Sequence, residues 1–277
     1  PENIERDKIK IAECPIVNVH GSLDEAPADG IVEKQQLVIS TKSLPFEDWK
    51  KTRIYASVAE FLYFNKLIQI PFMILNNLEK VSYKKLFEHF INEGKQFPII
   101  KEINENFKDH ADQISDGKSE FLFKEGFLDI FWPPGELEYI KLVMGRKFVN
   151  FYEEIKKLYL SFCSSESNKK VFLESVNLNK QMMRLPWNEK NEVFESNYNI
   201  LQVYTQILNL DKPLLEKKEN KYLIIKDDIM FKNPQEWMRE VIWYGHRSGK
   251  YLCKIKDINE KNFNDKSETN LVGPYIV

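Results

Sequence analysis

Residues 54–75, IYASVAEFLYFNKLIQIPFMIL, form the apolar stretch on which the fold of this chain depends. On a helix its apolar side chains would cover nearly the whole circumference, which is typical of a helix buried on all sides. The stretch is long enough to cross a hydrocarbon layer of about 30 Å. Glu60 and Lys66 lie near its centre, however, and each would cost about 2.5–3.5 kcal/mol there. We therefore predict a central helix of a globular domain that ends before Pro71, and no membrane span.

The segment before this helix predicts two strands and a helix start. Residues 36–41, QLVIST, are rich in β-branched residues, and a shorter strand is predicted over residues 9–12. Ser43 can then act as an N-cap, and Pro45 lies near the first helical turn.

Amphipathic patterns after Pro71 predict further helices, over residues 82–91, 98–115, 168–179, 188–208 and 234–244. The clearest pattern follows Pro133-Pro134, where apolar residues from Leu137 to Phe162 repeat in steps of three and four. That pattern predicts one helix of about seven turns. Residues 222–225 and 251–255 predict strands, residues 215–220 (LEKKEN) a linker, and residues 121–132 either a strand or a helix.

These elements predict a mainly α fold, a helical bundle-like domain with a few short strands at the N-terminal end and near residues 221–255. We expect residues 1–34 to be a remnant of, or linker from, a preceding unit, and residues 35–256 to form the mainly helical domain. Residues 257–277 are expected to be a polar tail. The chain begins with Pro1 rather than Met, so we expect a fragment of a longer protein.

Composition excludes several classes of protein. The 277 residues are 43% hydrophobic and 30% charged, which provides a core and excludes intrinsic disorder. Lys and Arg number 40 against 42 Asp and Glu, for a formal charge of −2, so no net field attracts nucleic acid or an anionic membrane. The 19 Phe and 12 Tyr against only 10 Gly favour long helices around a bulky core.

Common catalytic and metal-binding motifs are missing from the sequence. The three cysteines are widely separated and form no CxxC pair, and the four histidines show no HExxH spacing. No GxGxxG, GxxxxGK[ST] or GxSxG pattern occurs, so no catalytic residue and no metal ligand is assigned. Free thiols without a signal sequence indicate a cytoplasmic location.

Two segments are dense in large side chains with polar tips. In the first, Trp49 and Arg53 are one helical turn apart and can stack. In the second, a helix would place Trp237 and Tyr244 on one face and Arg239, Glu240 and Trp243 on another. Arg and Trp anchor many interfaces, so we take these residues as candidates for a pocket or docking face: Trp49, Arg53, Trp237, Arg239, Glu240, Trp243 and Tyr244. The alternative is that the aromatic rings only pack in the core while Glu and Arg pair locally.

Residues 38–69 read VISTKSLPFEDWKKTRIYASVAEFLYFNKLIQ, and residues 233–252 read NPQEWMREVIWYGHRSGKYL. The first resembles the "ST…(S/P)xEDW…R" strand and helix that follow the catalytic core of cobalamin-binding radical S-adenosylmethionine (SAM) proteins. The second resembles the "EWxREVxWYGRRxG" segment near the end of such chains. The resemblance covers residues 36–75 and 233–252. The cluster-binding CxxxCxxC and the cobalamin-binding DxHxxG motifs of the family are absent.

This resemblance implies that the chain is the C-terminal domain of such a protein. It would be an accessory domain that shapes or caps the substrate site of a B12-dependent radical SAM enzyme and would not be catalytic alone. The parent enzyme would contain a 4Fe-4S cluster, SAM and cobalamin, none of which this chain is expected to bind alone. The implied partners are the radical SAM core and the cobalamin-binding domain of the same protein.

Two other functions stay open at this point. A helical protein-interaction or scaffold module of unknown partner would expose an apolar patch around residues 237–244. A stand-alone enzyme without a motif would instead contain a deep pocket in which Glu, Arg and His side chains converge and have shifted pKa values.

Overall fold

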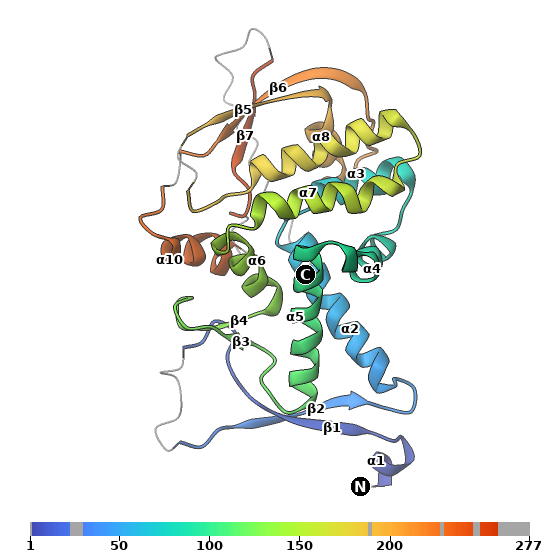
Figure 1. The fold of residues 1–277 in the computed structure, drawn as a ribbon, viewed down its shortest axis with the longest axis vertical. Helices are drawn as coiled ribbons and strands as arrows, with labels where there is room; N and C mark the ends of the chain where they lie inside the picture. Colours follow the sequence, from blue (N-terminus) through green and yellow to red (C-terminus); the bar gives the residue numbers. More distant parts are fainter. Residues whose placement is uncertain (1, 23–29, 188–189, 228–229, 246–249, 260–277) are drawn as a thin grey trace. The chain divides into compact units, whose positions relative to one another are not determined.

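The structure is a computed structural model that describes residues 2–22, 30–187, 190–227, 230–245 and 250–259 (Figure 1). Its described part is mainly helical with a few short antiparallel strands, which confirms the predicted fold class. Most of the expected polar tail, residues 260–277, lies outside the described residues, as do residues 246–249 of the second resembling segment. The chain divides into two compact units, Pro1–Phe61 with Phe87–Gly145 (unit 1) and Leu62–Leu86 with Arg146–Val277 (unit 2).

Unit 1 combines helices with two small strand pairs. Its elements are α1 (Glu2–Arg6), β1 (Lys10–Pro15), β2 (Lys34–Ser40), α2 (Phe46–Ala59), η3 (a 3₁₀ turn, Gly94–Gln96), α5 (Pro98–Ser115), β3 (Leu122–Phe123), β4 (Phe131–Trp132) and α6 (Pro134–Met144). Strands β1 and β2 pair antiparallel, as do β3 and β4. Helix α2 packs against β2 and α5, and α5 also packs against β1. Strand β1 lies within the segment expected to be a linker.

The strand pair of unit 1 is fixed to its helices by a small apolar cluster. Ala12, Cys14, Ile39, Trp49 and Ile114 are all buried in it. The Cys14 thiol also donates a hydrogen bond to the Ile114 carbonyl, with 3.4 Å between Sγ and O. Trp49 therefore has a structural role at the start of α2.

Unit 2 packs helices against a three-stranded sheet. Its elements are α3 (Gln69–Glu79), α7 (Phe148–Tyr159), η4 (a 3₁₀ turn, Leu160–Phe162), α8 (Glu166–Met182), β5 (Glu192–Tyr198), α9 (Ile200–Leu208), β6 (Lys217–Ile225), α10 (Pro234–Trp237), η5 (a π-helix, Met238–Trp243) and β7 (Lys254–Asp257). The sheet is antiparallel in the order β5-β6-β7. Helix α8 contacts α3, α7 and β5, as Figure 1 shows. The division between the units falls within α4 (Tyr83–Glu93) and the π-helix η2 (Glu60–Phe64).

The single central helix predicted before Pro71 is interrupted. It consists of α2 and η2, and a break at residues 65–68 separates these from α3. Lys66 in this break has a left-handed backbone with φ of 59°. The helix does end before Pro71, as predicted, because it stops at this break. Pro71 itself lies in the first turn of the next helix, α3, where its missing N–H is not needed.

Side chains from other parts of unit 2 stabilise this break. The Asn179 side chain on α8 accepts a hydrogen bond from the Ile70 N–H at 3.0 Å. Its amide nitrogen lies 2.9 Å from the carbonyl oxygens of both Lys66 and Leu67. The Tyr152 hydroxyl donates to the Leu67 carbonyl as well. Asn179 therefore caps the N-terminus of α3 from a helix more than 100 residues away in the sequence.

Two other helix predictions were wrong in part. The helix predicted from Leu137 to Phe162 is divided into α6, α7 and η4, because the backbone at Arg146 is left-handed with φ of 57°. The predicted helix 188–208 begins as strand β5, in which alternate side chains (Phe194, Ser196 and Tyr198) are buried, and is helical only as α9. The expected linker 215–220 contributes its last residues to β6. Helix α5, in contrast, has the predicted bounds.

No single helix in the described ranges is long and apolar enough to cross a membrane. The segments Phe46–Phe64 and Gln69–Glu79 meet the length and composition requirement only when taken together, across a bend.

Candidate functional site

A cavity of about 220 Å³ lies within unit 1, between α2, α5 and the loops before β3 and α6. Helix α2 and the first residue of η2 contribute Arg53, Ala56, Ser57 and Glu60, which recur at helical spacing on one face. Helix α5 contributes Phe107, His110, Ala111 and Ile114 in the same manner. Glu120, Phe121, Pro133 and Pro134 complete the lining. The cavity therefore combines an apolar wall with four ionisable side chains.

Glu60 is the first residue of the π-helix η2, an irregularity that is frequent at functional sites. Its Oε2 accepts a hydrogen bond from the Gly135 N–H at 3.2 Å, near the N-terminus of α6. A Cβ atom on residue 135 would lie only 2.8 Å from Glu60 Cδ, so glycine makes room for the carboxylate. Burial raises the pKa of Glu60 to about 8, the negative charge of Glu136 adds to this, and the Gly135 hydrogen bond opposes it.

The neighbouring carboxylate, Glu136, has a partner of its own. His20 Nε2 and Glu136 Oε2 are 2.7 Å apart, and both side chains are largely buried. The His20 ring also packs edge-on against Trp132, with 5.3 Å between the ring centroids. Glu136 is thus held by His20, and of these two neighbouring carboxylates only Glu60 lines the cavity.

His110 is the second unusual group of the cavity. Its side chain is 4% exposed, and burial lowers its pKa, so the ring is neutral at pH 7. The ring makes a hydrogen bond to the backbone of Ser119, which raises the pKa, as donation to a carbonyl does. Nε2 has no hydrogen-bond partner among the described residues, so Nδ1 makes the bond to Ser119. Nε2 is then a buried acceptor without a partner, on a side chain that lines the cavity.

Arg53 supplies a cation that is already neutralised. Its guanidinium pairs with Glu120, and its Cζ lies 5.6 Å from the centre of the Trp49 ring. This contact confirms the stacking predicted for these two residues from their spacing. Of the seven docking candidates, Arg53 also lines the cavity. Trp49 is buried next to Arg53 and does not belong to the lining.

The cavity can hold a ligand and exchange a proton with it. Glu60 is mostly protonated at neutral pH, and the neutral His110 offers a lone pair. Because His110 Nε2 is unpartnered, the two groups form no direct relay with each other. Within the described ranges no three His, Cys, Asp or Glu side chains come close enough to hold a metal ion. This convergence of Glu, Arg and His is the feature expected above of a site without a motif.

Sequence reasoning did not identify Glu60, His110 or Glu120 as site residues. Glu60 served only as an argument against a membrane span. The sequence did contain a signal, because ionisable residues recur at helical spacing with small or apolar ones. Arg53 and Glu60 flank Ala56 and Ser57 on one face of α2–η2, and His110 lies among apolar residues on one face of α5. Nothing in the sequence indicates that this face of α2–η2 packs against this face of α5.

The second candidate segment behaves differently from the prediction, because residues 238–243 form a π-helix. Trp237 is fully buried, and its Nε1 donates a hydrogen bond to the Arg184 carbonyl at 2.8 Å. Tyr244 does not share the Trp237 face: it is 40% exposed and stacks on Trp243, with 5.0 Å between centroids. Glu240 pairs with Lys250, and Arg239 is exposed. The wider winding of the π-helix changes which side chains share a face.

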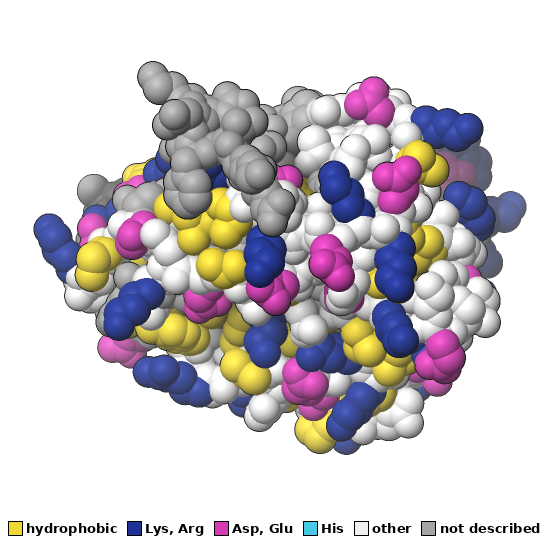
Figure 2. Space-filling view, turned by 90° about the horizontal axis from the view of Figure 1, so that it is seen from above, with side chains coloured by type: hydrophobic (Ala, Val, Ile, Leu, Met, Phe, Trp, Pro, Cys, Tyr) yellow, Lys and Arg dark blue, Asp and Glu magenta, His cyan; other side chains and the backbone are white. Residues whose placement is uncertain are grey.

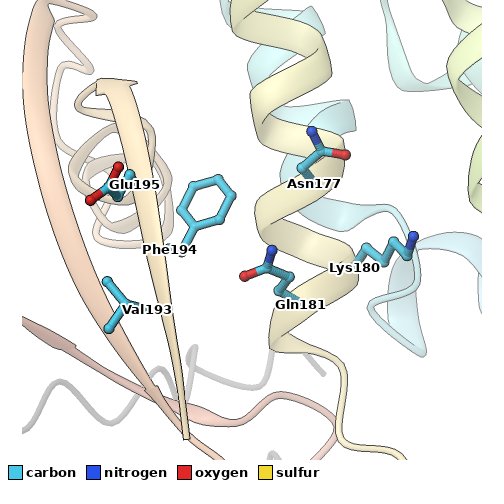
Figure 3. A pocket seen from close by; sticks show the side chains of 6 residues that line it. All are labelled: Asn177, Lys180, Gln181, Val193, Phe194 and Glu195. Atoms are coloured by element: carbon cyan, nitrogen blue, oxygen red, sulfur yellow. The ribbon is translucent and has the colours of Figure 1, made fainter.

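A second hollow, in unit 2, is a shallow groove of about 560 Å³ between α8 and β5. Figure 3 shows the Phe194 ring of β5 between the strand and α8, with Asn177, Lys180 and Gln181 on the helix. Glu195 is paired with Lys221 at 2.8 Å. None of the groove's ionisable side chains is buried, so the cavity of unit 1 is the better candidate site.

The cysteines are not suited to nucleophilic chemistry. Cys14, Cys163 and Cys253 are all buried and free. Burial raises the pKa of the Cys14 thiol, and it raises that of Cys163 to about 11. Both thiols therefore stay protonated at neutral pH, and the thiolate is the reactive form.

Replacing Glu60 by glutamine should remove a pH dependence of stability. Between pH 4.5 and about 8 the unfolded chain ionises Glu60 while the native state keeps it protonated. The free energy of unfolding of the wild type should therefore fall as pH rises through this window, by up to about 1.4 kcal/mol per pH unit from this group. Urea unfolding at pH 5, 6.5 and 8 measures the effect. Exposed Glu105→Gln is the control, and an equal slope in Glu60→Gln and wild type would contradict the expectation.

No protein-family model matches the chain, and no curated protein is detectably similar to it.

On the face shown in Figure 2, Lys and Arg side chains are interspersed with Asp and Glu. The described residues on that face form no continuous basic area of the kind that binds nucleic acid.

Proposed function

We propose that this chain is an accessory domain of a cobalamin-dependent radical SAM enzyme, which shapes or caps the substrate site and is not catalytic alone. The observation that carries the proposal is the position of the first resembling segment. It forms β2, α2 and η2, and through Arg53 and Glu60 it lines the cavity of unit 1. The first of the two resembling segments therefore also contributes one wall of the candidate site.

The cofactors of the parent enzyme would be bound elsewhere. All three cysteines are buried and free, and among the described residues no three His, Cys, Asp or Glu side chains come close enough to hold a metal ion. These residues do not fit a 4Fe-4S cluster, which needs a set of thiolates close together. The cluster, SAM and cobalamin would be held by the radical SAM core and the cobalamin-binding domain of the same protein, the proposed partners. The free thiols support a cytoplasmic location.

The coding sequence upstream of residue 1 tests this proposal most directly. We expect it to encode a CxxxCxxC-containing core in the same frame. A start codon immediately before Pro1, with no such core encoded beside it, would contradict the proposal. Reconstitution of the chain alone with iron and sulfide is the biochemical counterpart, and a cluster bound at one equivalent would equally contradict it.

A protein-interaction module is the second candidate function. It is favoured by the stacked pair Trp243 and Tyr244, because Tyr244 is 40% exposed and aromatic rings are common interface anchors. The buried Trp237 and Val241 do not contribute to such a patch. On the proposed function, the partner of this pair would be the radical SAM core.

Replacing Trp243 and Tyr244 together by alanine should weaken the association with a separately produced radical SAM core at least about tenfold. The reason is the loss of the exposed Tyr244 ring and of the half-buried Trp243 ring that stacks on it. Biolayer interferometry measures the dissociation constant. Phe64→Ala is the matched control, since Phe64 is a 57% exposed aromatic residue of the same unit. If the control weakened binding as much as the double variant, the aromatic pair would not be the docking surface.

A further inference from the structure

The cavity of unit 1 presents hydrogen-bond acceptors that nothing in the described chain uses. His110 Nε2 is an acceptor that is buried and unpartnered. Glu60 Oε2 accepts from the Gly135 N–H, which leaves Oε1 for another donor. A buried acceptor without a donor costs about 1–3 kcal/mol. A ligand that brings donors to this cavity would recover that free energy.

The charges around the cavity also favour one kind of ligand. The Arg53 guanidinium is neutralised by Glu120 on the lining, and Glu136 on α6 is paired with His20. His110 on α5 is neutral at pH 7 because burial lowers its pKa. Among the groups that face Glu60, no cation is therefore left to balance its carboxylate. An incoming cation would supply the missing charge.

The size and walls of the cavity limit the ligand. Its volume of about 220 Å³ equals that of about seven water molecules at liquid density. Phe107, Ala111, Ile114 and Phe121 provide an apolar wall beside the polar groups. A short alkyl chain or a small ring can pack on that wall while its polar end faces Glu60.

We propose that this cavity binds a small organic cation, a primary ammonium on a short apolar group, through the Glu60 carboxylate and His110 Nε2. The ammonium donates one hydrogen bond to Glu60 Oε1 and another to His110 Nε2, and the apolar part packs against Phe107 and Ile114. This inference goes beyond the proposed function, because it concerns the binding chemistry of the isolated chain and holds whether or not a radical SAM core precedes it.

Binding of the cation is coupled to the loss of a proton. Glu60 is mostly protonated below pH 8 and must ionise to pair with the ammonium. Arg53, His110 and Glu120 line the same cavity as Glu60, and Glu136 lies close enough for its negative charge to raise the pKa of Glu60. The affinity should therefore rise about tenfold per pH unit well below pH 8 and level off above it.

Isothermal titration calorimetry of the full chain tests the proposal, with three probes of matched size: butylamine hydrochloride, butan-1-ol and sodium butyrate. We expect butylammonium to bind at least about tenfold more tightly than the neutral and anionic probes at pH 7.5. We also expect one proton to be released per bound cation, measured in two buffers of different ionisation enthalpy. Equal affinity for butan-1-ol, tighter binding of butyrate, or no binding of butylammonium would overturn the proposal.

Two variants locate the binding to this cavity. Glu60→Gln should weaken butylammonium binding at least about tenfold and abolish proton release, whereas the exposed Glu105→Gln should change neither. Gly135→Ala keeps the charge but places a methyl group 2.8 Å from Glu60 Cδ, so the carboxylate has to move. It should weaken binding while the chain stays folded by circular dichroism. Unchanged affinity in both folded variants would place the cation elsewhere and overturn the proposal.

Discussion

Replacing Asn179 by alanine should lower the free energy of unfolding by about 3–5 kcal/mol, one of the two largest effects expected in this chain. The Asn179 side chain satisfies the Ile70 N–H and the Lys66 carbonyl at distances of 3.0 Å and 2.9 Å. Both backbone groups lie at the break before α3, and Asn179 itself is fully buried. Removal of the amide leaves a buried donor and a partly buried acceptor unsatisfied, and it leaves a cavity beside them.

Urea unfolding followed by far-ultraviolet circular dichroism measures this loss. Asn177→Ala is the matched control, because it removes the same side chain from the same helix at a partly buried position. We expect the control to change the free energy of unfolding by about 0.5 kcal/mol or less. If both variants lost a similar, small amount of stability, the cap on α3 would contribute little and the break would be held by apolar packing alone.

The same break shows why part of the fold could not be predicted from the sequence. Local signals were sufficient for α5, where Pro98 occupies the first turn and apolar residues recur on one face. They were also sufficient for the start of α4, where Ser82 Oγ accepts from the Lys85 N–H. The break at residues 65–68 depends on Asn179, which lies more than 100 residues further along the chain. Apolar periodicity alone cannot indicate such a partner.

Strand β5 was missed for a different reason. Residues 192–198, EVFESNY, bury every second side chain, but this short alternation was assigned to the helical pattern that follows it in α9. Pairing with β6 satisfies the backbone of this segment as a strand. Tertiary pairing thus overrides a local helical preference here.

In the candidate site, too, contacts within one helix could be predicted from the sequence and contacts between helices could not. The stacking of Arg53 on Trp49 was predictable, since residues four apart on a helix are neighbours. That Glu60 and His110 line one cavity, and that Glu60 accepts from the Gly135 N–H, was not predictable, because it requires α2, α5 and α6 to pack around that cavity. The seven docking candidates also separate by environment, since Trp49 and Trp237 are buried while Arg239 and Tyr244 are exposed.

Replacing Trp237 by alanine should cost about 3–5 kcal/mol of unfolding free energy, whereas Tyr244→Ala should cost about 1 kcal/mol or less. Trp237 is fully buried, and its indole N–H satisfies the Arg184 carbonyl, so truncation removes both a large apolar surface and a hydrogen bond. Trp237→Phe keeps most of the apolar contact and should cost about 1–3 kcal/mol for the unsatisfied carbonyl. Thermal and urea unfolding of the three variants measure these differences. A docking role for Trp237 would instead predict little loss of stability on truncation. A free energy of unfolding that increases from Trp237→Ala to Trp237→Phe to wild type would therefore indicate a core role, and equal values would indicate a surface role. The order that we expect would place Trp237 in the core and leave the stacked pair Trp243 and Tyr244 as the aromatic docking candidates of this segment.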